Sequence, residues 1–457
     1  MEKLSRKTRQ VMGAVLGSEA LFLFAAFLLR GILNVETFKW YLEGFSYLYA
    51  YVLCPWGGAL IALRLSRIER GLQQAGWEQK ILFFLLLWIS VPFLYRFGPT
   101  FNNVVTMTGY AMVFFGIYAS LSEREMKARR KQLKVLSCLF CLLSLVWGGA
   151  LLYCAWTGNV FGEADSLVFG VRRGMLWAGV HYNSVGMMAL CTLFMCLAAV
   201  EVFRKWPLRA LGALSAVIMV LVIILSQSRT ARYAMLLGLA AGTFGLVLYW
   251  KRTRKGILLA AGLSACVLIS GYLACSAITR LALHHYEVLE GAPSKGMAVL
   301  VTQAQAESRW ESTGKERVAV DATFSDRTNV WNNLFDLWKS EPGKLIIGRG
   351  VGNTGSLIAH GTSHEVDGTA SVHNTFLQFI ADFGLIGFAL QALFLGLTIV
   401  WALRAFFAPV PEKGVFSMAM LVAALMATGM MESAPLGQMT PTCLCLYFAL
   451  AYLRMPE

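Results

Sequence analysis

Residues 371–387 read Ser-Val-His-Asn-Thr-Phe-Leu-Gln-Phe-Ile-Ala-Asp-Phe-Gly-Leu-Ile-Gly, and they join the polar segment 278–376 to an apolar run that continues to Leu403. A helix that crosses a bilayer needs about 20 mainly apolar residues, and the run is long enough. The stretch therefore marks the point where a water-exposed segment meets a membrane, and His373 lies at that junction.

The composition of the whole chain agrees with this interpretation. Hydrophobic residues make up 57% of the 457 residues and charged residues 14%, and the mean hydropathy is +0.59. A soluble protein of this size cannot bury so much apolar surface, whereas a bilayer accepts it. We therefore predict an all-α polytopic membrane protein.

Apolar runs predict about twelve membrane-spanning helices. They cover residues 11–29, 45–63, 81–95, 104–121, 135–156, 175–200, 210–225, 233–250, 257–277, 377–403, 415–431 and 439–452. Lys and Arg gather in alternate short connections, for example at residues 123–131 and 251–255. Because cytoplasmic loops carry the excess of cations, we predict that both termini are cytoplasmic.

The long polar segment divides the chain into three parts, with spans one to nine in residues 1–277, an outer subdomain in 278–376 and spans ten to twelve in 377–457. The whole chain has a net charge of +14. The subdomain accounts for −2 of this sum, so the remaining chain has a net charge of +16. This distribution follows membrane orientation and argues against a nucleic-acid partner. Within the subdomain, residues 323–338 predict a helix with Ser325 as its cap, and Pro342-Gly343 should end it.

Two groups of cations stand at the predicted outer face. Arg229 and Arg232 interrupt apolar sequence, and Ser228 precedes them; Arg172 and Arg173 lie in the other outer loop. A cation at a bilayer is costly unless it faces a cavity or a partner, which favours a functional role for Arg229. An interfacial anchor is the alternative.

Other polar features leave alternatives open. Glu19 in the first span is either a helix–helix contact or a site residue. His360 and His364 have the i, i+4 spacing of zinc ligands, but Gly361 between them disfavours a helix and no third ligand is close. Gly348-Arg-Gly-Val-Gly-Asn-Thr-Gly resembles a phosphate-binding loop, yet no helix pattern follows, so a glycine turn that lets backbones approach closely is favoured. We therefore predict no metal site.

An imidazole and arginines at one membrane face suggest chemistry on a lipid diphosphate. Arginine binds phosphate oxygens bidentately, and a histidine that titrates near neutrality can accept a proton from a hydroxyl.

Three segments resemble the O-antigen ligase/polymerase family of membrane glycosyltransferases. They are Ser226-Gln-Ser-Arg229; Arg327-x-x-x-Trp331 followed by Pro342 and Gly348-x-Gly350-x-Gly352; and His373-Asn374 with Leu377 before Asp382-x-Gly384-Leu-Ile-Gly387. The resemblance covers most of residues 180–390. Where family members often have Asn-Pro-Asn, this chain has His181-Tyr-Asn183.

The resemblance implies a GT-C-like helical fold in the bacterial plasma (inner) membrane and an active site on its extracytoplasmic face. It implies transfer of a glycan from undecaprenyl diphosphate to an acceptor hydroxyl, without cofactor, metal or nucleotide sugar. His373 would be the base of an inverting reaction, and Arg229 and Arg327 would bind the diphosphate. The supporting residues would be Asn374, Asp382, Ser228, Arg173 and Trp331.

The resemblance leaves open which reaction the enzyme performs. A ligase passes a finished glycan to a glycolipid or other acceptor, such as lipopolysaccharide core, while a polymerase passes it to another repeat unit. Only one predicted outer loop is large, which favours a ligase. A lipid-linked glycan flippase is the alternative from another class; it predicts repeated halves, and none is visible.

Overall fold

The computed structural model describes residues 2–32, 48–65, 76–95, 107–159, 169–172, 175–178, 182–291, 322–351, 354, 357–358, 372–432 and 440–454. For residues 2–7, 9, 48–50, 64–65, 92–95, 172, 287–291 and 322–327 it describes the backbone only. Everything below concerns these residues.

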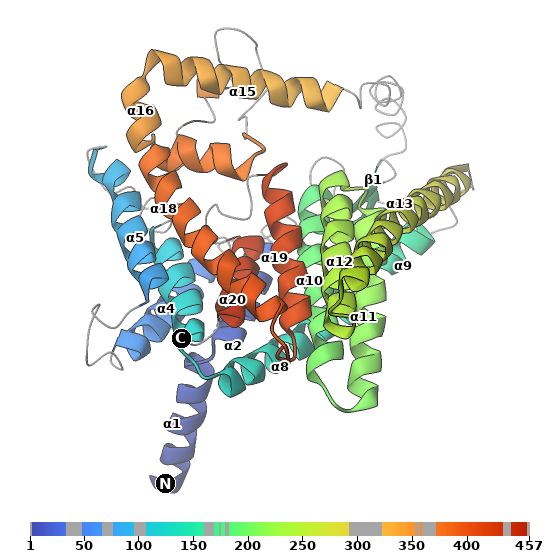
Figure 1. Cartoon of the computed structure of the whole chain (residues 1–457), viewed down its shortest axis with the longest axis horizontal. Helices are drawn as coiled ribbons and strands as arrows, with labels where there is room; N and C mark the ends of the chain where they lie inside the picture. The colour runs from blue at the N-terminus through green and yellow to red at the C-terminus, as the bar shows by residue number, and fades with distance from the viewer. Residues whose placement is uncertain are drawn as a thin grey trace.

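The fold is a bundle of helices with one small hairpin (Figure 1). The helices of the first half are α1 (Glu2–Leu16), α2 (Glu19–Phe27), η1 (Leu28–Ile32), α4 (Leu48–Leu65), α5 (Trp77–Tyr95), η4 (Met112–Ala119), α7 (Ser120–Ser122), α8 (Met126–Leu143), η5 (Ser144–Gly148) and α9 (Gly149–Thr157). The remainder are α10 (Tyr182–Val202), α11 (Trp206–Leu225), α12 (Arg229–Trp250), α13 (Arg254–Gly291), α15 (Ala322–Ser340), α16 (Pro342–Ile347), α18 (Thr375–Phe406), α19 (Val415–Gly429) and α20 (Pro441–Leu453). Strands β1 (Phe169–Arg172) and β2 (Met175–Ala178) form an antiparallel pair.

The protein is a multi-pass membrane protein. In the described residues, six helices are long and apolar enough to cross a membrane, or seven if one bent pair is counted as a single span. Four shorter apolar helices accompany them, at Tyr51–Leu63, Met107–Ser122, Val415–Gly429 and Pro441–Leu453. Each of the twelve predicted spans contains a helix, but a count of twelve crossings stays a prediction.

Helix α10 lies in the middle of the bundle and α13 at its edge. In the most apolar stretch of α10, 83% of the residues are buried, against 6% for α13. Small residues let neighbours approach α10, since a Cβ on Gly238 of α12 would lie 2.5 Å from Phe194 Cζ. This close packing is typical of membrane helices, whose association depends on van der Waals contact.

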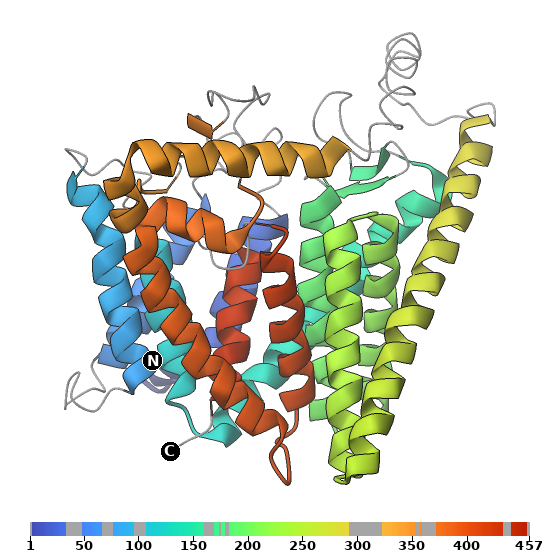
Figure 2. The same ribbon diagram turned by 45° about the horizontal axis from the view of Figure 1, so that its top comes forward.

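The two ends of the bundle differ. Helix α15 lies across one end of the bundle, above the start of α18 (Figures 1 and 2). Helix α16 follows α15 in the chain and packs against α18. The connections from α12 to α13 and from α18 to α19 lie at the opposite end. We call these the His373 end and the Arg124 end, after the residue before the N-cap of α18 and a residue of the turn between α7 and α8.

Three local predictions were wrong. Residues 11–29 are not one straight helix, because Gly17 and Ser18 break it with a bend of 59°. The predicted sixth span starts at Tyr182 rather than at 175, since Met175–Ala178 pair with β1. Ser325 does not cap the outer helix, which begins at Ala322. That helix does end before Pro342-Gly343, at Ser340, and Pro342 then starts α16.

Candidate active site

His373 stands directly before α18, in a backbone conformation that non-glycine residues seldom adopt. Its φ is +49°, and Asn374, the N-cap, accepts hydrogen bonds from the N–H groups of Phe376 and Leu377 at 3.0 Å. A left-handed non-glycine residue costs roughly 1–3 kcal/mol and persists only where its surroundings impose it. An apolar helix therefore begins directly after His373, and the backbone is strained at the histidine.

Glu432 contacts the imidazole from the end of α19. Its Oε2 lies 3.5 Å from His373 Nδ1, and its backbone carbonyl accepts a 2.6 Å hydrogen bond from the Thr375 hydroxyl. Its Oε1 lies 3.4 Å from Asn183 Nδ2, on the first turn of α10. The carboxylate thus links three helices at the His373 end.

Sequence reasoning missed Glu432, although a signal existed. The residue directly follows an apolar run at the predicted outer face. The rule that singled out Arg229, a charge at the membrane boundary that needs a partner, applies to this carboxylate as well.

Helix α15 contacts the segment before His373. The Trp331 indole donates a 2.8 Å hydrogen bond to the carbonyl of Val372, and Val330, Leu334 and Val372 share a small apolar cluster. Arg327 lies one helical turn before Trp331 in the backbone of α15. Its side chain is outside the described residues, so its predicted role stays a prediction.

The glycine loop after α16 meets a break in α18. Gly384 has φ +70° inside the helix, which leaves the preceding carbonyl groups without helical partners. The N–H groups of Arg349 and Gly350 donate to the carbonyls of Ala381 and Asp382 at 3.0 and 2.8 Å. A Cβ on Gly348 would lie 2.3 Å from Asp382 O, so the predicted close backbone approach occurs here.

Asp382 is linked to the segment next to His373 through the side chain of Gln378. Gln378 donates to Asp382 Oδ1 at 3.0 Å and accepts from the Val372 N–H at 3.4 Å. Asp382 is buried, as is Asn374. Both residues hold the start of α18 through these hydrogen bonds, which do not involve the imidazole.

The segment Ser226 to Arg229 has the same backbone feature as the segment at His373, a non-glycine residue with a positive φ. Gln227 has φ +55°, and within the described residues only Gln227 and His373 combine a positive φ with a side chain. Ser228 caps α12 by accepting from the Ala231 N–H, and Arg229 is exposed at the helix start. The neighbouring Arg232 donates to Thr279 and to the Gln227 carbonyl.

Helix α10 joins the two motifs. A Cβ on Gly186 would lie 2.8 Å from Ser228 Cβ and 3.1 Å from Ser226 Oγ, so only glycine fits against that turn. One turn earlier on the same helix, Asn183 reaches Glu432, which contacts His373. Helix α10 therefore contacts the turn that precedes Arg229 through Gly186, and it reaches the imidazole of His373 through Asn183 and Glu432.

Some predicted residues lie outside the described part of the chain. They are Arg173, His181, His360 and His364. Within the described residues, no group of three or more His, Cys, Asp and Glu side chains could hold a metal ion. The zinc alternative at His360 and His364 is thus not tested.

The described groups suit two kinds of ligand, an anion and a hydroxyl group that acts as a nucleophile. The imidazole of His373 is half-exposed and has a carboxylate at Nδ1, and a histidine side chain can take up a proton. An exposed arginine starts α12, where the helix dipole adds partial positive charge. Both features lie at the same end of the bundle.

Comparison with known proteins agrees with the motifs. Residues 214–392 match the family model described as O-Antigen ligase. This segment contains Arg229, Arg327, His373 and Asp382, whereas Asn183 and Glu432 lie outside it. No curated protein matches the chain. By its match to that model, this multi-pass membrane protein contains an O-antigen ligase domain at residues 214–392.

Proposed function

We propose that the protein transfers a glycan from undecaprenyl diphosphate to an acceptor hydroxyl, with His373 as the base and without a metal ion. Family membership supports an activity of the ligase or polymerase type. The observation that carries the assignment of the base is the contact between Glu432 and His373 Nδ1. A carboxylate at Nδ1 favours the tautomer whose Nε2 is free of a proton, as a base requires.

The proposed reaction is a single displacement. His373 Nε2 accepts the proton of the acceptor hydroxyl while that oxygen attacks the anomeric carbon. The bond from this carbon to the diphosphate oxygen breaks, and its electron pair remains on the lipid diphosphate. Because attack and departure occur on opposite sides of the carbon, the anomeric configuration inverts.

Arginine side chains stabilise the leaving group in this proposal. Negative charge grows on the diphosphate as the glycosidic bond breaks, and Arg229 and Arg327 would bind its oxygens. Cations fixed before the reaction stabilise such a transition state without reorganisation. Trp331, Asn374, Asp382 and Ser228 would position the backbone of the two motifs through the hydrogen bonds described above, and Arg173 would add positive charge.

The proposed topology places this chemistry outside the cell. Basic connections such as Lys251 to Lys255 lie at the Arg124 end, and the His373 end lacks such a run in the described residues. We therefore assign the Arg124 end and both termini to the cytoplasm, with twelve crossings of a bacterial inner membrane. The carrier lipid then enters from the bilayer, and the acceptor hydroxyl comes from a glycolipid or glycan.

A ligase is favoured over a polymerase because the polar segment 278–376 is the one large outer connection in the sequence. A gene deletion separates the two. If the ligase is lost, long glycans accumulate on the lipid carrier, and if the polymerase is lost, single repeat units accumulate. An unchanged pattern of lipid-linked and surface glycans on a gel would contradict both.

Purified protein tests the base directly. With a lipid-linked glycan and an acceptor, His373→Ala should lower the transfer rate at least about a thousandfold, within the range for loss of a general base. His284→Ala, an exposed histidine on α13, is the matched control and should transfer normally. Transfer by His373→Ala at a rate near that of the parent would remove His373 from the mechanism.

A further inference from the structure

Helix α1 has two chemically distinct faces. Leu4, Val11 and Val15 recur at i, i+7 and i+11 and share one face, whereas Lys3, Arg6 and Gln10 recur on the opposite face. The helix carries four cations, Lys3, Arg6, Lys7 and Arg9, and one anion, Glu2. This pattern of cations opposite aliphatic residues is typical of helices that lie in a membrane interface.

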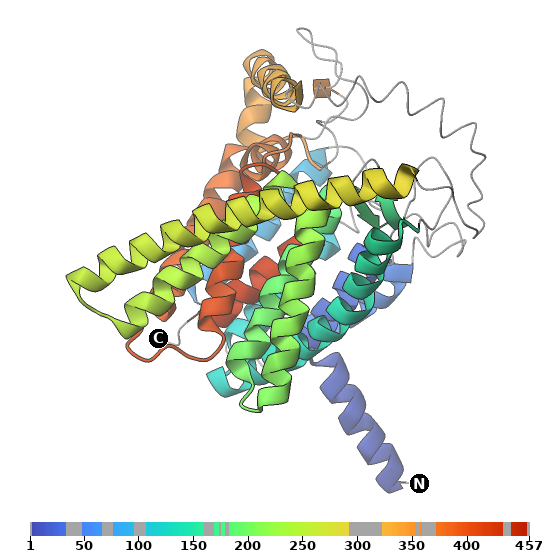
Figure 3. The same cartoon turned by 90° about the vertical axis from the view of Figure 1, so that its right-hand side faces the viewer.

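Within the described residues, the apolar face of α1 is largely uncovered away from its last turn, where the Trp56 indole of α4 donates to the Leu16 carbonyl. Val11, Met12 and Val15 are 61%, 55% and 40% exposed. The helix projects from the Arg124 end of the bundle, as Figures 1 and 3 show. A soluble environment would leave these aliphatic side chains in water, so something else must cover them.

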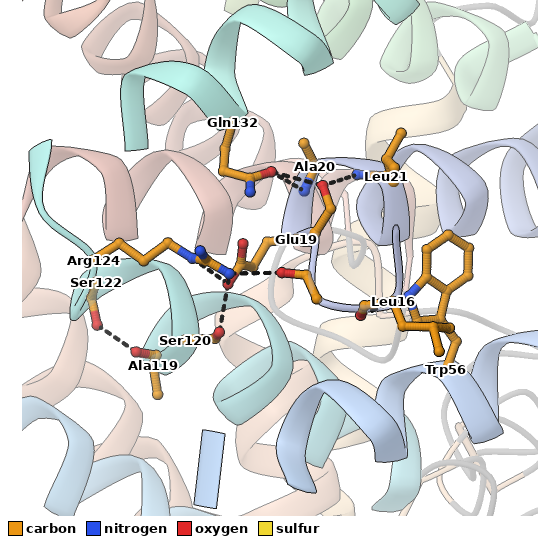
Figure 4. Close-up of polar contacts among 12 residues, drawn as sticks. Leu16, Glu19, Ala20, Leu21, Trp56, Ala119, Ser120, Ser122, Arg124 and Gln132 are labelled. Carbon is orange, nitrogen blue, oxygen red and sulfur yellow. Dashed lines mark hydrogen bonds and ion pairs between the residues drawn. The ribbon is translucent and has the colours of Figure 1, made fainter. Parts of the chain in front are cut away.

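A polar junction fixes where α1 leaves the bundle (Figure 4). Ser18 caps α2 and donates to Gln132 Oε1 at 2.9 Å, and Gln132 also accepts from the Ala20 N–H. Arg124 binds both the Glu19 carboxylate, at 2.8 Å, and the Gly17 carbonyl, at 2.7 Å. The bend of 59° is thus held on both sides, and α1 cannot continue straight into the bundle.

We propose that α1 lies on the bilayer surface at the Arg124 end and recognises anionic lipid headgroups. Its aliphatic face enters the border between headgroups and acyl chains, and its lysines and arginines contact the phosphates. Charge complementarity selects this occupant: four cations within seven residues suit a negatively charged leaflet, and α2 beside the bend already lies among membrane helices.

The surface anchor does not depend on the proposed glycan transfer. It rests on residues 2–20 and their contacts at the end of the bundle opposite His373. Its test therefore reads the environment of α1 rather than activity.

Hydrogen exchange of the full-length protein in nanodiscs measures that environment without labels. Two discs are compared, one of phosphatidylcholine alone and one with phosphatidylglycerol added. We expect amides of residues 6–16 to exchange at least about tenfold more slowly in the anionic disc, since each cation near such a surface contributes roughly fivefold in binding. Amides of α10 serve as the folding control and should be equal in both discs.

Two variants separate the faces. Val11→Ser with Val15→Ser should remove the slow exchange in both discs, and Arg6→Gln with Lys7→Gln should remove only the increment due to anionic lipid. Gln10→Ser, on the polar face, is the matched control and should behave like the parent.

Three results would overturn the proposal. Equal exchange in the neutral and anionic discs would exclude headgroup recognition. Unchanged protection in the serine variant would show that the aliphatic face contacts no lipid. Protection that appears only with two copies per disc would indicate that a second chain covers α1.

Discussion

The two ends of the molecule treat their charged side chains in opposite ways. At the Arg124 end, Glu19 is fully buried and accepts from Ser120 at 2.6 Å and from Arg124 at 2.8 Å. At the His373 end, the imidazole is 41% exposed and its carboxylate partner lies 3.5 Å away. The carboxylate at the Arg124 end is buried with short contacts, whereas the imidazole at the His373 end is partly exposed and its contact with the carboxylate is longer.

A second buried pair at the Arg124 end repeats the tight arrangement. Arg454 Nε lies 2.5 Å from Glu78 Oε1, next to the end of α20. Arg129, also buried, donates to the carbonyls of Arg124, Ser122, Ala451 and Arg454. These bonds tie the third, fourth, fifth and last predicted spans together at the Arg124 end.

The backbone shows the same difference. Both non-glycine residues with a positive φ in the described chain, Gln227 and His373, lie at the His373 end. Backbone strain costs stability, and it clusters where binding or catalysis uses it. The comparison therefore separates a structural lock from the proposed site.

After the loss of His373 itself, we expect the largest fall in transfer rate for a change at Arg229, which also lies at the His373 end. Arg229→Ala should lower transfer about 100- to 1000-fold, because removal of one group that stabilises a developing anion has this size of effect. The measurement is transfer by purified protein at saturating acceptor. Arg209→Ala, an exposed arginine at the opposite end of α11, is the control. Equal rates in the two variants would contradict a diphosphate role.

The break in α18 should come next. In Gly384→Ala the new Cβ would lie 2.1 Å from the Ile346 carbonyl, in a backbone with φ +70°. The part of α18 between His373 and Gly384 must then shift, and a displacement near 1 Å can cost about a hundredfold in rate. Gly396→Ala on the same helix has nothing within 4 Å of its Cβ and should be silent. A fully active Gly384→Ala would show that the loop does not position the histidine.

A smaller effect is expected at Glu432. Glu432→Gln keeps the shape but removes the charge from His373 Nδ1, and we expect kcat to fall about tenfold with KM unchanged, the lower limit for a group that orients another. Glu432→Asp should recover part of the rate. If the glutamine variant instead unfolds at a lower temperature and transfers normally per folded molecule, Glu432 serves only packing.

The smallest effect on transfer is expected in the lock at the Arg124 end. Glu19→Gln should leave transfer per folded molecule unchanged but lower the free energy of unfolding by about 2–3 kcal/mol, below the usual range for breaking a buried pair because Arg124 is 25% exposed. Glu412→Gln breaks the exposed pair with Arg130 and should cost at most about 1 kcal/mol. Thermal unfolding in detergent compares them, and a large loss of transfer in Glu19→Gln would erase the distinction between the two ends.

Much of the bundle follows from the sequence. Apolar length located a helix in each predicted span, and glycine-rich sequence at residues 348–352 predicted a close backbone approach. The first span was misread because hydropathy tolerates Gly17, Ser18 and Glu19 in an otherwise apolar run. Their hydrogen bonds to Arg124 and Gln132, more than a hundred residues away, decide the bend.

The candidate site shows the same limit. His373, Arg229 and the glycine motifs could be selected from residue type and position at a membrane boundary. Glu432 could not be paired with His373, nor Asn183 with Glu432, because 59 and 249 residues separate them. No local pattern encodes which carboxylate reaches which imidazole.

The sequence by itself determined a polytopic helical membrane protein and a ligase-type domain at residues 214–392, and it selected the side chains proposed to react, because partition into lipid and motif chemistry are local properties of the chain. Only the tertiary structure decided that α15 braces Val372, that the glycine loop caps a broken α18 and that α10 links the two strained motifs. These features depend on how helices pack side by side. Packing is a sum over contacts between distant residues, and hydropathy along the chain carries no information on it.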